Sequence, residues 1–495
     1  MDSMIGRDVI VPQHEEQRTA QGRPLHYGYL LLALFLLTLP LCNPWVRGDG
    51  VGYYAYARSM LIEKRLDFES DWEHANESFQ MGRLDANGRP LPKEYTSTGH
   101  IRNISSVGPS ILWFPFLLIS HSIVLVADHF GAHIPADGFS APYRTAMALA
   151  TAMYGFLSLW ISFLLARKYF DERWAFLACV GIWGASSLPV YMYFNPSWAH
   201  APAAFVVALF IWYWHRTRGE RSPKQWIILG LLSGLMVDVY YLNGVFLLIP
   251  LIEAILRYRK EFESPDGRAH GFVKLAAFHL LYTAAFVVGV LPTLITRWII
   301  FGSLLQTGYP TAASWNWNSP FLWSVLWSAD HGLLSWTPIL IFALFGLLLF
   351  RRADRSFAAE LIACFVIFYL IVAFYPDWDG ISSFGSRFFV SLTPIFVIGL
   401  TASLAWLATI WNERRARIVA AGSVGAFVLW NCGMMFQWGV HLLPPRGPIS
   451  WRQTAYNQIA VVPRQIVHGV GSYFAHRNQL MRHIEETDIK NLKAP

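Results

Sequence analysis

The stretch that decides the fold is YGYLLLALFLLTLPLCNPWVRGDGVGYY, residues 27–54. Its first part, residues 27–44, is apolar and long enough as a helix to cross a hydrocarbon core of about 30 Å. The chain then becomes polar, and Asp49 lies a few residues beyond the expected membrane boundary, followed by Tyr53 and Tyr54. A carboxylate and clustered tyrosines at the depth of lipid phosphate groups predict a reaction centre at the membrane surface.

Composition indicates the same class of protein. Of the 495 residues, 54% are hydrophobic and 14% are charged, and the mean hydropathy is +0.35, which is typical of a polytopic, all-α membrane protein. Such a length would suggest several domains in a soluble protein, but a single transmembrane bundle is the simpler interpretation here. The net charge of +7 comes from Lys and Arg residues in short loops between apolar spans. That pattern indicates membrane topology and anionic membrane lipids as partners, and not nucleic acid.

Hydropathy predicts most of the membrane spans directly. The apolar stretch 226–256 would be about 46 Å long as one helix, so we predict two short helices that turn around Asp238 to Asn243. The other predicted spans are residues 27–44, 144–166, 174–191, 200–214, 273–297, 333–350, 358–375, 388–411 and 417–437.

The basic loops orient this bundle. The loops near residues 167–173, 216–224, 257–268, 351–355 and 414–417 should all be cytoplasmic. They share one side only if residues 108–127, which contain Pro109 and Pro115, form a juxtamembrane or re-entrant segment. This interpretation gives about eleven transmembrane helices, and twelve crossings remain the alternative.

Three regions follow from this topology. We expect a cytoplasmic segment at residues 1–26, a transmembrane catalytic domain at 27–440, and a polar C-terminal extension at 441–495 on the outer side. Within the catalytic domain, a long first outer loop would occupy about 45–107, ahead of the juxtamembrane segment at about 108–127.

Two motifs in the outer loops resemble those of a known group of enzymes. The runs DGVGYYAYARS (residues 49–59) and FGSRFF (residues 384–389), the latter followed by Pro394, are similar to motifs of bacterial members of the GT-C superfamily of integral-membrane glycosyltransferases. That superfamily includes protein O-mannosyltransferases and lipid A aminoarabinose transferases. No clear Asp-Asp or Glu-Asp pair occurs in the first loop, and there is no large C-terminal soluble domain, which argues against the oligosaccharyl and protein-mannosyl branches.

The resemblance implies a GT-C-like bundle whose long first outer loop contains juxtamembrane helices. It also implies transfer of a sugar from a polyprenyl-phosphate-linked donor to a lipid, glycan or protein acceptor at the outer, periplasmic face of the cytoplasmic membrane. Asp49 is then the expected general base of an inverting transfer, and Arg387 the expected donor of hydrogen bonds to the phosphate. Lys93, Arg58 and Arg102 are further candidates for phosphate binding.

Other residues of the outer loops are candidate substrate-binding groups. Aromatic side chains offer faces for a sugar ring, and polar side chains near the membrane boundary offer hydrogen bonds. Asp238 in particular should face water, a partner or the cavity, because an unpartnered carboxylate at mid-bilayer is costly. No cofactor is required by the pattern, and a divalent metal ion bound by Asp330, Asp377 or Asp379 remains open. The substrate-binding candidates are Tyr53, Tyr54, His200, Asp238, His331, Asp377, Trp378 and Asp379.

Structural roles and other functions remain as alternatives. Asp49 is also placed to cap a helix, Arg387 to extend from a span end to the interface, and the aromatic residues to form an interfacial belt. A transporter or flippase for a lipid-linked or amphiphilic substrate would also carry polar residues in a membrane cavity, although no internal repeat is visible. A lipid-linked glycan polymerase or ligase is a further alternative, but its arginine-rich outer loops are represented here mainly by Arg387.

Overall fold

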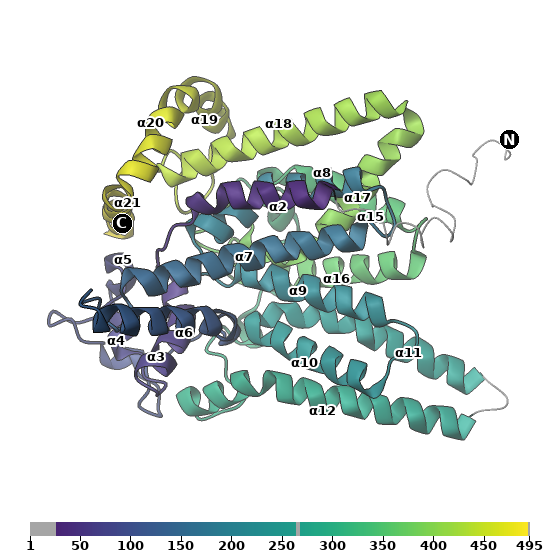
Figure 1. The fold of residues 1–495 in the computed structure, drawn as a ribbon, viewed down its shortest axis with the longest axis horizontal. Helices are drawn as coiled ribbons and strands as arrows, with labels where there is room; N and C mark the ends of the chain where they lie inside the picture. Colours follow the sequence, from purple (N-terminus) through teal and green to yellow (C-terminus); the bar gives the residue numbers. More distant parts are fainter. Residues whose placement is uncertain (1–25, 264–267, 494–495) are drawn as a thin grey trace.

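The computed structural model describes residues 26–263 and 268–493, so the expected cytoplasmic segment 1–26 lies outside them except for its last residue. The fold is all-helical, with isolated bridges as the only β structure in the described residues. A bundle of helices makes up most of the molecule, and most of these helices run side by side along its long axis (Figure 1). The helices of the bundle are α2 (His26–Thr38), α6 (Gly108–His129), α7 (Ala141–Ala166), α8 (Glu172–Gly184), α9 (His200–Thr217), α10 (Pro223–Val239), α11 (Leu248–Glu263), α12 (Arg268–Phe301), α15 (Ile339–Phe350), α16 (Arg355–Phe374), α17 (Thr393–Ile410) and α18 (Glu413–Gly439).

Further helices lie in the loops and in the C-terminal extension. The first loop contains α3 (Asp49–Ile62), α4 (Glu69–Glu73) and α5 (Glu77–Gln80), and the later loops contain α13 (Leu322–Trp327) and α14 (Leu333–Trp336). The C-terminal extension forms α19 (Trp451–Tyr456), α20 (Val462–Ala475) and α21 (Arg477–Lys493).

Seven helical segments of the described chain are long and apolar enough to cross a membrane. The turn predicted between residues 238 and 243 is confirmed, because α10 ends at Val239 and a 3-10 turn, Tyr241–Leu247, leads into α11. The predicted total of eleven crossings stays a prediction. The seven segments are Gly108–His129, Ala141–Ala166, Tyr241–Glu263, Gly271–Phe301, Arg355–Phe374, Arg387–Ile410 and Glu413–Gly439.

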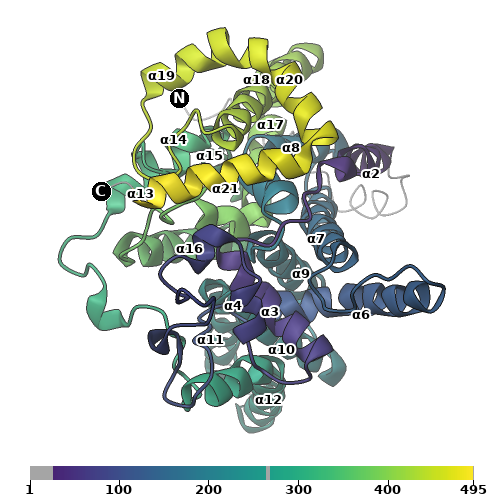
Figure 2. The same cartoon turned by 90° about the vertical axis from the view of Figure 1, so that its left-hand side faces the viewer.

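Helix α6 differs in direction from its neighbours. In Figure 2 most long helices are seen end on, whereas α6 extends sideways across the view. Its composition would allow a crossing, and apolar side chains on its outer half, such as Ile119 and Ile123, are exposed. Helix α6 is therefore a candidate membrane span that is inclined to the bundle, and its predicted juxtamembrane position stays a prediction.

The basic loops meet at one end of the bundle. Arg173 pairs with Glu413, and Arg218 donates to Asp354 at 2.6 Å, so loops that are distant in sequence are joined there. Helix α3 and the rest of the first loop lie at the opposite end (Figure 1). The chain thus separates a cation-rich end from the end that carries Asp49.

The C-terminal extension folds over the end that carries α3. Helices α19, α20 and α21 form an arc there, and α21 crosses in front of the bundle (Figure 2). Asp488 pairs with Arg47, directly before α3, and the Asn76 amide donates to Glu485 at 2.9 Å. The extension therefore holds the start of the first loop.

Candidate functional site

Asp49 and Arg387 form an ion pair across 338 residues of sequence. The Arg387 Nη1 donates to Asp49 Oδ2 at 2.7 Å. Gly48 occupies the N-cap position of α3, and Asp49 is the first helical residue, where the helix dipole favours a negative charge. The Asp49 side chain is 52% exposed and that of Arg387 is 13% exposed, so the carboxylate stays accessible to a substrate.

The glycines around Asp49 allow α3 to pack closely against two other segments. A Cβ added at Gly50 would lie 1.9 Å from the Ser197 Oγ, and one added at Gly52 would lie 2.3 Å from the Ser105 Oγ. Neither distance is tolerated in a packed interior, so only glycine fits at these positions without displacement. The glycine pattern after Asp49 therefore fixes where the carboxylate lies.

Trp198 supports both members of the ion pair. The Arg387 guanidinium lies over the Trp198 ring, 4.6 Å from its centroid, in a cation–π contact. The Trp198 Nε1 donates to the carbonyl of Arg47 at 3.0 Å, in the segment that leads into Asp49. His200, two residues further on, is buried, and its Nδ1 has no hydrogen-bond partner among the described residues.

A cavity of about 1120 Å³ opens beside the ion pair. One part of its wall is polar and comes from the first loop, with Arg83 and Glu94 among its residues. Another part comes from helix α16, where Ile367, Ile371 and Val372 are apolar and belong to a candidate membrane span. Seven of the predicted site residues line it, namely Asp49, Tyr53, Lys93, Arg102, His200, Asp377 and Arg387.

Tyrosine side chains form much of the remaining wall. Burial raises the pKa of Tyr53 and of Tyr309, and the charge of Asp49 adds to both shifts. Burial, with a smaller contribution from Asp377, raises the pKa of Tyr375 to about 12. These tyrosines are therefore neutral at physiological pH and offer hydroxyl donors and ring faces.

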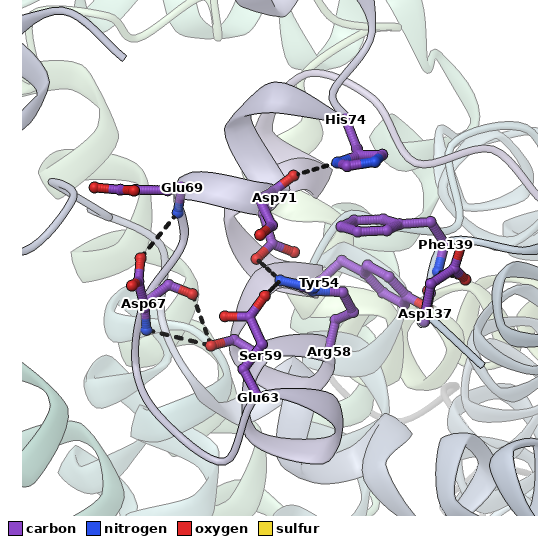
Figure 3. A network of polar contacts seen from close by, with 12 residues as sticks. Tyr54, Arg58, Ser59, Glu63, Asp67, Glu69, Asp71, His74, Asp137 and Phe139 are labelled. Atoms are coloured by element: carbon purple, nitrogen blue, oxygen red, sulfur yellow. Dashed lines mark hydrogen bonds and ion pairs between the residues drawn. The ribbon is translucent and has the colours of Figure 1, made fainter. Parts of the chain in front are cut away.

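Arg58 and Tyr54 lie outside the cavity. The Arg58 side chain is 2% exposed and pairs with Asp71 at 3.0 Å and with Glu63 at 2.5 Å, between α3 and α4 (Figure 3). The Tyr54 hydroxyl donates to the carbonyl of Gly138 at 2.7 Å. Two carboxylates already match the charge of Arg58, so this placement does not support its predicted contact with a donor phosphate.

Asp238 and Trp378 also lie away from the cavity wall. Asp238 is buried, and its Oδ1 accepts from the backbone N–H of Thr293 at 3.3 Å, so it faces α12. Trp378 stacks on Phe321 with ring centroids 5.6 Å apart. Both residues hold neighbouring elements together in this arrangement and do not face a substrate space.

The acidic residues of the late loops separate into two groups. Asp377 lines the cavity, whereas Asp379 joins Asp330 and His331 in a cluster whose ligand-type atoms lie within 4.8 Å of one another. Burial lowers the pKa of His331 to about 4, partly offset by Asp379, which leaves the imidazole neutral. The group suited to a metal ion is therefore the cluster with His331, and Asp377 is not part of it.

Several residues that shape the site were not predicted. Tyr240 and Tyr309 line the cavity, and so does Asn103. Arg297 is almost fully buried, and it donates to the carbonyl of Asn103 at 2.9 Å and to the Tyr56 hydroxyl at 2.6 Å. The sequence did contain a signal for Arg297, which is a charged residue within the apolar run of α12. Charged residues inside membrane spans usually have a partner or a function.

Part of the chain matches a known protein family. Residues 142–282 match the family model described as dolichyl-phosphate-mannose-protein mannosyltransferase. The chain has no match among curated protein sequences.

Two solved structures are similar in architecture. ArnT from Cupriavidus metallidurans is 15% identical over 91% of this chain and 77% of its own, with a TM-score of 0.43. The oligosaccharyltransferase AglB from Archaeoglobus fulgidus, solved with an inhibitory peptide and a dolichol-phosphate, is 13% identical over 90% of this chain, with a TM-score of 0.44. The present chain spans 56% of the length of AglB.

The family match covers α7 to α11 and the first part of α12, including His200, but neither Asp49 nor Arg387. The roles of those two residues therefore depend on the geometry described above. Residues 142–282 are therefore similar to a mannosyltransferase family, within a multi-pass, all-helical chain whose described residues include seven candidate membrane spans.

Proposed function

We propose that the protein moves a sugar from a polyprenyl-phosphate donor to a lipid, glycan or protein acceptor at the outer face of a cytoplasmic membrane. The observation that carries this proposal is one cavity with two kinds of wall. The Asp49–Arg387 pair lies beside it, and the apolar side of α16 continues it along a membrane span. A donor with a charged head and a long apolar tail needs both features at once.

The ion pair suggests an order of events. The donor phosphate replaces Asp49 on the Arg387 guanidinium, which is a strong hydrogen-bond donor to phosphate oxygens. Asp49 is then free to accept the proton of the acceptor hydroxyl. The acceptor oxygen forms its bond to the sugar C1 as the bond from C1 to the phosphate oxygen breaks, and the configuration at C1 inverts. The polyprenyl phosphate leaves with its charge stabilised by Arg387.

Other groups of the cavity wall fit supporting roles. Lys93 and Arg102 extend the positive charge on the first-loop side of the cavity. Tyr53, Tyr309 and Tyr375 remain protonated and offer hydroxyls and ring faces to the sugar.

The charge separation along the bundle supports the outer location of the site. The short basic loops gather at the end opposite Asp49, and such loops are generally retained in the cytoplasm. The C-terminal extension, which packs at the Asp49 end, is then also on the outer side, and residues 27–440 form the catalytic membrane domain.

Sugar transfer in proteoliposomes tests the proposal. Purified protein is incubated with a panel of labelled polyprenyl-phosphate sugars and a total lipid extract as acceptor, and Asp49→Asn is compared with wild type. Transfer should fall by about 10²- to 10⁴-fold in the variant because a general base is removed. Glu73→Gln is the matched control, because Glu73 is an exposed acid of the same loop that lies outside the cavity, and it should transfer at the wild-type rate.

Two results would contradict the proposal. Equal transfer by wild type and Asp49→Asn would remove Asp49 from the mechanism. Movement of lipid between leaflets in the absence of any sugar transfer would instead indicate a flippase.

A further inference from the structure

Asp330, His331 and Asp379 come together from two different outer loops. Asp330 and His331 lie in the turn between α13 and α14, and Asp379 lies in the loop that follows α16. One nitrogen or oxygen atom from each of the three side chains lies within 4.8 Å of the other two. None of the three lines the large cavity, so the cluster is separate from the proposed donor site.

His331 makes no well-formed hydrogen bond inside this cluster. The residue is 1% exposed, and both ring nitrogens lack a hydrogen bond of good geometry within the described chain, although the imidazole also interacts with the backbone of Asp379. Its Nδ1 lies 3.3 Å from the Asp330 Oδ1, which is also buried without a hydrogen bond. Buried polar atoms are almost always satisfied in folded proteins, so a buried imidazole that faces carboxylates without a well-formed hydrogen bond is suited to binding a further ligand.

We propose that this cluster binds a divalent transition-metal ion of the zinc type. One imidazole nitrogen and two carboxylate oxygens are a donor set that zinc accepts, with the fourth tetrahedral position left to water. Ligand atoms about 2.0 to 2.2 Å from a tetrahedral metal lie roughly 3.4 Å from one another, so the three side chains need only a small contraction around the ion. Magnesium and calcium fit less well, because they prefer all-oxygen ligand sets.

The position of Asp379 indicates what the ion would do. The next residue, Gly380, packs so closely on the Arg387 side chain that an added Cβ would lie 3.0 Å from the Arg387 Nε. The Ser383 hydroxyl closes the same loop by donating to the carbonyl of Gly385 at 2.9 Å. A metal that joins Asp379 to His331 would hold this loop against the turn before α14 and so position Arg387 for the donor phosphate.

Metal binding does not depend on the proposed function, whereas the effect on Arg387 does. The two are therefore tested separately. Cobalt is the probe for binding, because its visible absorption reports the coordination geometry and zinc displaces it from sites of this type.

The binding experiment uses the full chain in detergent, stripped with a chelator and titrated with Co²⁺. Wild type should bind one equivalent and release it to Zn²⁺. Asp379→Asn and Asp330→Asn should each weaken Co²⁺ binding by at least tenfold. Asp377→Asn is the matched control, because Asp377 lies in the same loop but outside the cluster, and it should bind Co²⁺ as wild type does.

Thermal unfolding of the stripped proteins shows whether each variant is folded. His331→Ala leaves a space in a buried position, so the two half-exposed aspartates carry the conclusion if that variant fails to fold. Absence of a stoichiometric Co²⁺ site in wild type, or equal binding by wild type and both aspartate variants, would overturn the proposal.

Transfer kinetics test the second part of the proposal, which is the effect of the metal ion on Arg387. If the ion positions Arg387, stripping or Asp379→Asn should raise the donor KM several-fold with little change in kcat, and added Zn²⁺ should restore only the wild type. Metal binding without any sugar transfer would leave the site intact and refute the proposed function. Sugar transfer with no metal bound would leave the proposed function intact and refute the metal site.

Discussion

Replacing Asp49 by Asn should have opposite effects on catalysis and on binding of the lipid phosphate. The proposed order of events makes Asp49 a competitor of the phosphate for Arg387, because the two side chains pair at 2.7 Å in the absence of substrate. The amide keeps the shape of the side chain but loses the charge. Transfer should therefore collapse while the affinity for polyprenyl phosphate rises.

The magnitudes follow from the exposure of the pair. Since the Asp49 side chain is 52% exposed, the ion pair contributes at most about 1 kcal/mol after solvent screening, so its loss should tighten phosphate binding by no more than about fivefold. Loss of the base should lower kcat by about 10²- to 10⁴-fold, or roughly 3 to 5 kcal/mol in the activation barrier.

The assay is competition between polyprenyl phosphate and a fluorescent analogue for protein in nanodiscs, at several salt concentrations. The gain in affinity should shrink as salt is added, because the pair is partly exposed. Arg387→Lys is the companion variant, and it should bind the phosphate more weakly, because an ammonium group lacks the planar pair of donors. If Asp49→Asn lost both transfer and phosphate affinity, Asp49 would be holding Arg387 in place and not competing with the substrate, and the reasoning would fail.

Three further predictions concern the framework around this pair. Gly50→Ala should lower the unfolding free energy by about 1 to 3 kcal/mol and reduce transfer, since its Cβ would collide with Ser197, and Ser197→Gly should restore part of both in thermal unfolding and transfer assays. Asp488→Asn should weaken the contact of α21 with Arg47 by roughly 1 kcal/mol, which faster proteolysis of the C-terminal extension would report. Arg297→Met should cost about 3 kcal/mol, because it removes buried hydrogen bonds to the carbonyls of Asn103, Ser105 and Thr307, and the melting temperature should fall accordingly.

Local pattern predicted part of the fold and drew attention to two residues that the structure brings together. The length of the apolar run 226–256 predicted the turn after α10, and the acid after the first span and the arginine of the late motif marked Asp49 and Arg387. Their pairing was not predictable, because 338 residues separate them and neither motif specifies its partner.

The residues that the structure places elsewhere share a cause. Arg58 was considered as an isolated cation. In the structure its charge is matched by Glu63, just after the end of α3, and by Asp71 in α4. In the same way Asp377 and Asp379 were treated as equivalent, although the loop turns one toward the cavity and the other toward His331. Whether a charged residue faces the cavity depends on which opposite charges lie near it in the folded chain. The positions of titratable residues in the sequence do not give that information.

The number of crossings was not predictable from the sequence for a related physical reason. Helix α8 has 13 residues and α10 has 17, so each is short for a span of its own and depends on neighbouring helices for burial. Helix α6 has 22 residues with the composition of a span, but it is inclined to the bundle. Length and hydropathy alone cannot distinguish these situations, because packing and tilt set the depth of each helix.

The site depends on a series of contacts that leads inward from the end of the chain. Asp488 of α21 pairs with Arg47, whose carbonyl accepts from Trp198, and the Trp198 ring supports Arg387 against Asp49. Each contact is modest when taken alone, and the last of them is partly exposed to solvent. Because the contacts are connected, the outer extension and the turn before α9 restrict the same carboxylate from two sides. That arrangement leaves Asp49 accessible to a substrate while its position also depends on Asp488, Arg47 and Trp198, which lie outside the cavity.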